Sequence, residues 1–166
     1  AKKINVIVTP SVNSKADIHI DFKVPMENIQ VIPNGIDCDI FYPLPQILSK
    51  KNRLITTASA DVPLKGLDFS LEAIARLKLE YPDIHLMVIG SPRKEGHTER
   101  LLKKLELENN VSFRTNLTKE EIAQEYAQSE AAIVSSLYEG FGFQHIEPFG
   151  DYKPDPLALF FEKRLG

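Results

Sequence analysis

The chain has few of the residues that mark an unusual environment. Cys38 is the single cysteine among 166 residues. It cannot close an internal disulfide and has no second thiol for a metal site, so a disulfide-stabilised fold is excluded and a reducing compartment is favoured. No apolar run approaches the ~18 residues of a membrane span, and the start at Ala1 lacks the apolar core of a signal peptide. We therefore expect a cytoplasmic protein.

Positive charge is also scarce. The chain has 20 Lys and Arg against 23 Asp and Glu, which gives a net charge of -3. Without a basic field to neutralise a phosphate backbone, we expect no nucleic-acid partner. No spacing of His, Cys and Asp suggests a tight metal site, so none is expected. A peripheral membrane contact of the intact protein stays open.

What remains is typical of a soluble α/β domain. Short apolar runs alternate with longer amphipathic stretches, a pattern that predicts a parallel sheet with flanking helices. The expected strands cover residues 54–58, 85–89, 111–113 and 131–134, the last as a buried strand, and helices begin near residues 67, 101 and 119. Thr118 and Glu121 form a capping box for the third helix. In the strand order 3-2-1-4, the first and fourth strands are neighbours where the winding reverses, and ligands collect at that point.

The first third of the chain has a different pattern. We expect a strand over residues 4–8, a helix over 11–22 that Ser11 or Ser14 caps, and a strand over 29–32. Two prolines and a polar stretch then indicate a linker. The predicted divisions are residues 1–42, a linker at 43–52, a ligand-binding domain at 53–150, and an atypical tail at 151–166 with a short helix over 157–165.

A glycine-rich turn follows the fourth expected strand. Gly140 and Gly142 come directly after Glu139, and Glu147 closes a motif with seven residues between its two carboxylates. Such a turn lets the backbone approach an anion closely, and the start of a helix behind it adds free N–H groups, so we expect both a phosphate ligand and a helix there. Carboxylates beside a phosphate would accept hydrogen bonds from sugar or ribose hydroxyls.

Three motifs in order resemble one family. The segment from Glu139 to Glu147 resembles the E-x7-E motif of the family 4 (group 1) retaining glycosyltransferases, GT-B enzymes that use nucleotide sugars. The stretch Val31-Ile32-Pro33-Asn34-Gly35-Ile36-Asp37, followed by Phe41-Tyr42-Pro43, resembles their crossover between domains. The stretch from Thr57 to Leu67, with the pair Lys65-Gly66, resembles the first strand and phosphate loop of their nucleotide-binding domain. The resemblance covers roughly residues 4–147 and implies a Rossmann-like donor-binding domain preceded by the end of the acceptor domain.

The resemblance also implies a role for each candidate residue. Glu139 would reach the donor sugar, Glu147 would bind the ribose hydroxyls, and Lys65 would hold the diphosphate. The backbone of the turn, formed by Gly140, Phe141, Gly142 and Phe143, would share the diphosphate. The stretch 111–116 at the end of the third strand, with Phe113 and Arg114 in it, would face the base. Glu139 and Lys65 are the catalytic candidates, because stabilising the departing diphosphate lowers the barrier. The nucleotide sugar is a donor substrate, so no cofactor is expected, and the acceptor, a sugar, a lipid or a protein, stays open.

The chain departs from the family pattern at two positions. Ala60 stands where an arginine is common, and Pro148 disfavours a helical conformation at Glu147. The acceptor site belongs to a domain that we expect to be missing, so the chain alone should transfer little sugar until that domain is supplied in cis or in trans. Two alternatives stay open: a non-catalytic nucleotide-sugar-binding module, and an interaction fragment that pairs through an exposed sheet edge.

Overall fold

A computed structural model describes residues 5–58, 62–136, 144–146 and 160–162 of the chain. The chain forms two compact units, one of residues 36–138 and the other of residues 1–35 with 139–166. Residues 32–49, between the second and third strands, contain no helix or strand, whereas residues 50–52, the last three of the predicted linker at 43–52, belong to the third strand.

The larger unit is built on a parallel sheet of four strands. These are β3 (Lys50–Thr57), β4 (His85–Ile89), β5 (Val111–Arg114) and β6 (Ser129–Ala132). Their order is β5-β4-β3-β6, and every pair of neighbours is parallel. The predicted order 3-2-1-4 is therefore confirmed, with β3 as the first strand.

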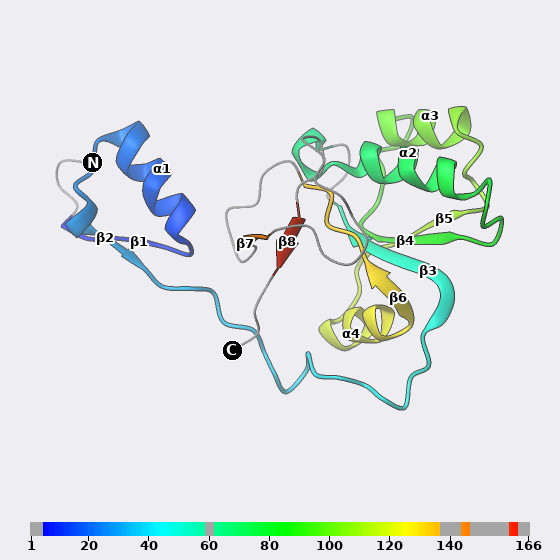
Figure 1. The fold of residues 1–166 in the computed structure, drawn as a ribbon, viewed down its shortest axis with the longest axis horizontal. Coiled ribbons are helices and arrows are strands. Elements are labelled where there is room, and N and C mark those ends of the chain that lie inside the picture. The colour runs from blue at the N-terminus through cyan, green and yellow to red at the C-terminus, as the bar shows by residue number, and fades with distance from the viewer. Residues whose placement is uncertain (1–4, 59–61, 137–143, 147–159, 163–166) are drawn as a thin grey trace. The chain divides into compact units, whose positions relative to one another are not determined.

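Helices cover both faces of this sheet (Figure 1). The helices are α2 (Leu67–Leu77), α3 (His97–Lys104) and α4 (Lys119–Ala127), with the 3-10 turn η2 (Pro63–Lys65) before α2. Figure 1 shows α2 and α3 on one face and α4 on the other. The helix α4 begins at the predicted capping box, since the Glu121 amide donates to the Thr118 hydroxyl at 3.2 Å and the Thr118 amide donates to the Glu121 carboxylate at 2.8 Å.

The core lies between the sheet and the pair α2 and α3. Leu71 and Ile74 of α2 are fully buried, and each such side chain contributes roughly 1.5–3 kcal/mol of transfer free energy. The whole cluster consists of Ala58, Leu67, Leu71, Ile74, Ile84, Leu86, Val88, Leu102, Leu107 and Val111. The helical spacing of leucines and isoleucines in the sequence thus corresponds to the buried faces of these helices.

The strand β6 differs from its prediction in place and in burial. It ends at Ala132 rather than Val134, and Ala131 and Ala132 are exposed. Among the described strands, β6 pairs only with β3, so it lies at an edge of the sheet. An apolar run of small residues does not distinguish a central strand from an edge strand, which is why the expectation of a buried strand was wrong.

The smaller unit contains a second parallel pair of strands. In this unit β1 (Ile7–Thr9) pairs with β2 (Ile29–Val31), and α1 (Val12–Phe22) and the 3-10 turn η1 (Met26–Asn28) connect them. The Ser14 amide donates to the Ser11 hydroxyl at 3.0 Å, so Ser11 is the N-cap of α1.

Two segments expected to be helical are strands where the structure describes them. Residues after the glycine-rich turn form β7 (Gln144–Ile146), and residues of the tail form β8 (Phe160–Glu162), which pairs with β7 in antiparallel register. The predictions of a helix start after the turn and of a helix over 157–165 are therefore wrong. Ile146, Phe160 and Phe161 are β-branched or aromatic residues that favour strands, and a partner strand far away in the sequence is not visible in a local helical pattern.

Candidate functional site

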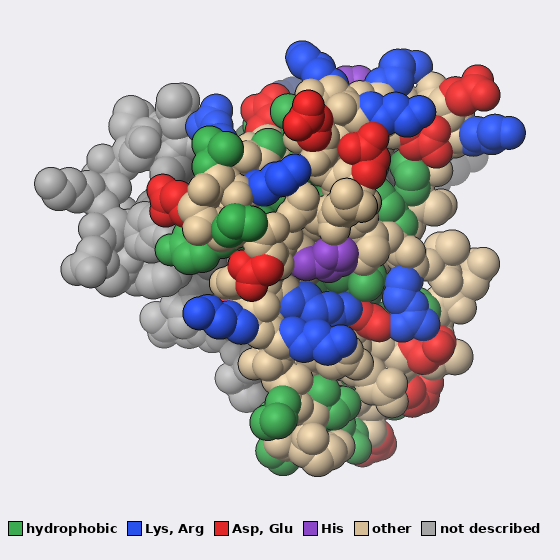
Figure 2. All heavy atoms as spheres, turned by 90° about the vertical axis from the view of Figure 1, so that its right-hand side faces the viewer, with side chains coloured by type: hydrophobic (Ala, Val, Ile, Leu, Met, Phe, Trp, Pro, Cys, Tyr) green, Lys and Arg blue, Asp and Glu red, His purple; other side chains and the backbone are tan. Residues whose placement is uncertain are grey.

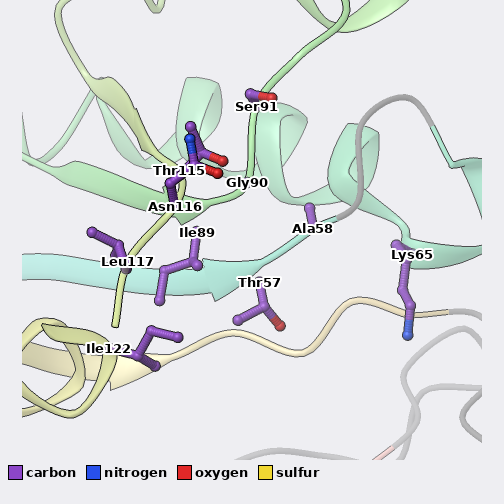
Figure 3. A pocket seen from close by; sticks show the side chains of 10 residues that line it. All are labelled: Thr57, Ala58, Lys65, Ile89, Gly90, Ser91, Thr115, Asn116, Leu117 and Ile122. Carbon is purple, nitrogen blue, oxygen red and sulfur yellow. The ribbon is translucent and has the colours of Figure 1, made fainter. Parts of the chain in front are cut away.

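A hollow of about 450 Å³ opens at the carboxyl ends of the central strands. Figure 3 shows its lining at close range: the ends of β3 and β4, the loop after β5, one residue of α4, and Lys65 at the far side. The lining residues are Thr57, Ala58, Lys65, Ile89, Gly90, Ser91, Thr115, Asn116, Leu117 and Ile122.

The topology explains why a hollow forms at this edge. The chain leaves β3 toward α2 on one face and reaches β6 from α4 on the other face (Figure 1). Because the connections on the two sides of β3 lie on opposite faces, their ends separate at the carboxyl edge and leave a crevice.

Lys65 brings a positive charge to this hollow. It ends the turn η2, is half-buried, and extends its side chain along the rim of the hollow (Figure 3). Gly66 follows in the left-handed conformation, with φ 64°, and serves as the N-cap of α2 without any side-chain cap. The first amides of α2 and the Lys65 ammonium thus lie close together in the chain, and both favour an anion.

Position 66 requires glycine for two reasons: its left-handed backbone conformation and the close approach of Ser135. A Cβ atom at this position would lie 1.9 Å from the backbone oxygen of Ser135. The loop that carries Lys65 is therefore pressed directly against the segment that leaves β6, on the path toward Glu139.

A second glycine shapes the floor of the hollow. Gly90 has φ 144°, and a Cβ atom there would lie 2.0 Å from the backbone oxygen of Ala58. The Gly90 amide donates to the backbone oxygen of Arg114 at 2.8 Å. The ends of β3, β4 and β5 are thereby held close together beneath any ligand.

The wall opposite Lys65 combines polar and apolar groups. Thr115, Asn116 and Leu117 follow β5, and Asn116 has the left-handed φ of 57°. At the floor, the hydroxyl of Thr57 is hydrogen-bonded to Tyr126 of α4. Desolvation of the Tyr126 phenol raises its pKa, and the hydrogen bond with Thr57 offsets only part of that rise.

Two predicted base contacts lie beside the hollow rather than in its lining. Phe113 packs against the hydrophobic core. Arg114 forms ion pairs with Glu121 and Glu125 of α4. Thr115 and Asn116, from the same predicted stretch 111–116, line the wall, and a role of any of these residues toward a base stays a prediction.

A buried ionic network that the sequence did not indicate joins β3 to α4. The guanidinium of Arg53 in β3 pairs with the Glu125 carboxylate and also donates to the Glu125 backbone oxygen at 3.0 Å and the Ser129 hydroxyl at 2.8 Å. Burial alone would raise the pKa of Glu125, but hydrogen bonds from Arg53 and Arg114 and their charges lower it below its usual range. The only signal in the sequence is Arg53 just before an apolar strand, and that position gives no indication of a partner 72 residues away.

The glycine-rich turn and its carboxylates lie outside the described residues. These positions are Glu139, Gly140, Phe141, Gly142, Phe143 and Glu147. The structure therefore brings together Lys65, Gly66 and the segment leading to this turn, and the roles of the turn itself stay predictions.

Other kinds of site find no support in the described part of the chain. No group of three or more His, Cys, Asp and Glu side chains could hold a metal ion among these residues. No helix there is long and apolar enough to cross a membrane. Lys and Arg side chains are interspersed with Asp and Glu on the face that Figure 2 shows.

Solved structures with similar folds include glycosyltransferases. Staphylococcus aureus TarM, in a variant bound to UDP, superposes with a TM-score of 0.68 at 20% identity and covers 84% of this chain and 27% of its own. Anabaena HepE in complex with UDP-glucose superposes with a TM-score of 0.65 at 22% identity and covers 89% of this chain and 40% of its own. At this level of identity the likeness establishes the GT-B type of fold.

The sequence comparisons identify the family. The MMP alpha-(1->4)-mannosyltransferase of Mycolicibacterium hassiacum is 38% identical over 154 residues, which are 93% of this chain and 37% of that enzyme. The chain thus spans little more than a third of this relative's length. These matches do not favour a non-catalytic module or an interaction fragment. Residues 45–150 match the family described as "Glycosyl transferases group 1", and the chain belongs to this family.

Proposed function

We propose that the chain carries the donor-binding half of a retaining glycosyltransferase, which transfers a sugar from a nucleoside diphosphate sugar to an acceptor. The observation that carries this proposal is the place of Lys65 in the lining of a hollow at the carboxyl edge of the sheet, two residues before the first residue of α2. A volume of about 450 Å³ falls within the range of small-molecule sites.

In the proposed complex, the diphosphate lies at the Lys65 end of the hollow. The Lys65 ammonium and the free amides at the start of α2 offset its charge. The same groups stabilise the charge that develops on the diphosphate as it leaves, so they increase the rate of transfer as well as the affinity. The chain therefore needs no metal at this position in the proposed mechanism.

The nucleoside lies along the opposite wall. Asn116 offers an amide to the polar edge of the base, and Leu117 and Ile122 offer apolar contact. Phe113 and Arg114 act on the base indirectly, because they hold the backbone that continues into this wall. Glu147 accepts hydrogen bonds from the ribose hydroxyls, and Glu139 reaches the sugar, as the resemblance implies.

The relatives support a proposal for the transferred sugar and for the class of donor. The 38% identical relative is named as a mannosyltransferase, which supports mannose as the donor sugar. One structural neighbour binds UDP-glucose and another binds UDP, which supports a nucleoside diphosphate sugar as the class of donor. The acceptor is a sugar, a lipid or a protein.

Nuclear magnetic resonance titration tests the proposed binding site. UDP, GDP and ADP, each with and without a sugar, are added to the labelled chain while backbone amide shifts are followed. We expect saturable shifts at Gly66, Gly90 and Asn116 for at least one nucleotide. Shifts confined to other parts of the chain, with these three amides unchanged, would place the ligand elsewhere.

Retention is tested on a protein that spans the relatives' whole length. The one-bond coupling between the anomeric carbon and its proton in the first product formed reports the anomeric configuration, for mannose as well as for other sugars. We expect the configuration of the donor, and the opposite configuration would refute a retaining mechanism.

A further inference from the structure

We propose that Ser135 and Ser70 are positioning residues that fix the Lys65 loop, so that the Lys65 ammonium faces the diphosphate. This inference rests on the proposed function, because it assigns a device to the same site. Its subject is a pair of hydroxyls outside the lining of the hollow that connect the phosphate loop to the exit of β6.

A chain of two hydrogen bonds connects these three residues. The Ser70 hydroxyl donates to the Ser135 hydroxyl at 2.9 Å, and the Ser135 hydroxyl donates to the backbone oxygen of Lys65 at 3.2 Å. Ser70 lies in the first turn of α2 and has an exposed fraction of only 2%. Because Ser70 is buried on a rigid helix, it holds the Ser135 hydroxyl in the orientation that reaches Lys65.

The backbone contact at Gly66 makes this connection close. A Cβ atom on Gly66 would lie 1.9 Å from the backbone oxygen of Ser135 and 3.3 Å from its Cβ atom. The Lys65 carbonyl and the Gly66 Cα atom therefore both contact Ser135, one through a hydrogen bond and the other through packing. Two contacts on consecutive residues fix both the position and the orientation of the loop.

The position of Ser135 in the chain gives this connection a functional meaning. Ser135 follows β6 and precedes Glu139 by four residues. A residue that is bonded to the Lys65 loop thus lies on the segment that leads to the predicted sugar-binding carboxylate. Ser135 and Ser70 act on the ligand through Lys65, since the hydroxyl of Ser135 is directed to the Lys65 backbone.

Ligand affinities of alanine variants test this inference. Dissociation constants are measured for inorganic pyrophosphate, for the tightest of UDP, GDP and ADP, and for the matching nucleoside without phosphate. Loss of a single hydrogen bond corresponds to a change of about 2-fold to 12-fold. We expect Ser135→Ala and Ser70→Ala each to raise the dissociation constants of pyrophosphate and the nucleoside diphosphate by about 3-fold to 10-fold. The dissociation constant of the nucleoside should stay within about 2-fold of the wild-type value.

A double-mutant cycle with Lys65→Ala separates positioning from general structural damage. If Ser135 acts through Lys65, then Ser135→Ala has no further effect on pyrophosphate affinity once Lys65 is alanine.

Asn110→Ala is the matched control. Like Ser135→Ala, this variant removes two side-chain hydrogen bonds, which the Asn110 amide donates to the backbone oxygens of Pro82 and Ile84 at 3.2 and 2.9 Å. Asn110 directly precedes β5, at the end of that strand away from the hollow. This control should lower the melting temperature and leave pyrophosphate affinity within about 2-fold.

Three results would overturn the inference while the proposed function stands. These are unchanged pyrophosphate affinity in Ser135→Ala, an equal loss for the nucleoside and the diphosphate, and a loss that persists in full on the Lys65→Ala background. Absence of any saturable binding to the wild type would instead overturn the proposed function, and this inference with it.

Discussion

At the scale of single residues, the two predicted carboxylates differ in what they should contact. Glu139 directly follows the segment that leaves the sheet, and Glu147 ends the motif seven intervening residues later. We expect Glu139→Gln to weaken the binding of a nucleotide sugar more than the binding of the plain nucleotide. Glu147→Gln should weaken the binding of both ligands. A hydrogen bond to a charged acceptor contributes roughly 1.5–3 kcal/mol, so each loss should be about tenfold or more. Equal effects of both variants on both ligands, measured by calorimetry, would refute the assigned roles.

Gly66 and Gly35 form a matched pair of glycines. Gly66→Ala places a Cβ atom against Ser135 and demands a left-handed backbone from alanine, which alone costs roughly 1–2 kcal/mol. At Gly35 no atom lies within 4 Å of the added Cβ atom. We expect Gly66→Ala to lower the free energy of unfolding by about 2 kcal/mol or more, and Gly35→Ala to change it by less than about 0.5 kcal/mol.

Denaturant unfolding of both variants measures these free energies. A Gly66→Ala variant as stable as the wild type would show that the Lys65 loop is not pressed against the exit of β6.

At the scale of secondary-structure elements, the Arg53 and Glu125 pair joins β3 to α4. Both side chains are buried, with exposed fractions of 9% and 7%. Removal of one partner from a buried pair leaves an uncompensated charge and typically costs about 3–5 kcal/mol. We expect Glu125→Ala to lower the free energy of unfolding by an amount in this range. Asp37→Ala, which removes the exposed ion pair with Lys119, should lower it by less than about 1 kcal/mol.

The same pair predicts a pH dependence. The pKa of Glu125 is lowered in the folded chain, so its contribution to stability is complete above the usual glutamate pKa of about 4.3. That contribution is lost as the pH falls from there through the lower folded pKa. We expect Glu125→Gln to flatten the acid side of the stability curve between about pH 5 and pH 3, whereas the wild type loses stability there. Parallel curves for the two proteins would contradict this assignment.

The elements also show what the sequence could and could not predict. The helical spacing in α2, the capping box at Thr118 and the order of the strands depend on local pattern and on the rules for parallel sheets, and these predictions are confirmed. The edge position of β6 and the pairing of β7 with β8 depend on partner strands far away in the chain, which local periodicity does not report. The Arg53 and Glu125 pair was missed for the same reason.

The same distinction between local sequence signals and contacts of distant residues applies to the candidate site. Lys65 and Gly66 were found because a resemblance and a helix start coincide there, and both lie at the hollow or beside it. The wall residues Thr115 and Asn116 belong to the stretch 111–116 that the resemblance placed beside the base, whereas Leu117 was not singled out, because a loop after a strand carries no periodic signal. Arg114 was predicted to face the base, and its ion pairs with α4 are visible only in three dimensions.

At the scale of the whole molecule, we expect the chain alone to bind a sugar donor without transferring the sugar to an acceptor. Catalysis requires an acceptor held in line with the donor, and orientation of two reactants supplies roughly 7–11 kcal/mol. The chain spans 37% of the length of its mannosyltransferase relative. We therefore expect the chain alone to bind a donor and at most to hydrolyse it slowly. Multiple-turnover transfer to any acceptor in a panel of sugars, lipids and proteins, followed with radiolabelled donor, would show that a second half is not needed.

Calorimetric titration of the chain with UDP, GDP and ADP tests the donor-binding proposal most directly. We expect saturable heat for at least one nucleotide with a dissociation constant of about 0.1–1 mM, and an affinity about tenfold weaker or more in Lys65→Ala. The Gly35→Ala variant, which alters an open position, should bind as the wild type does. No saturable heat with any of the three nucleotides up to several millimolar, or equal affinity in Lys65→Ala and the wild type, would contradict a diphosphate site at Lys65.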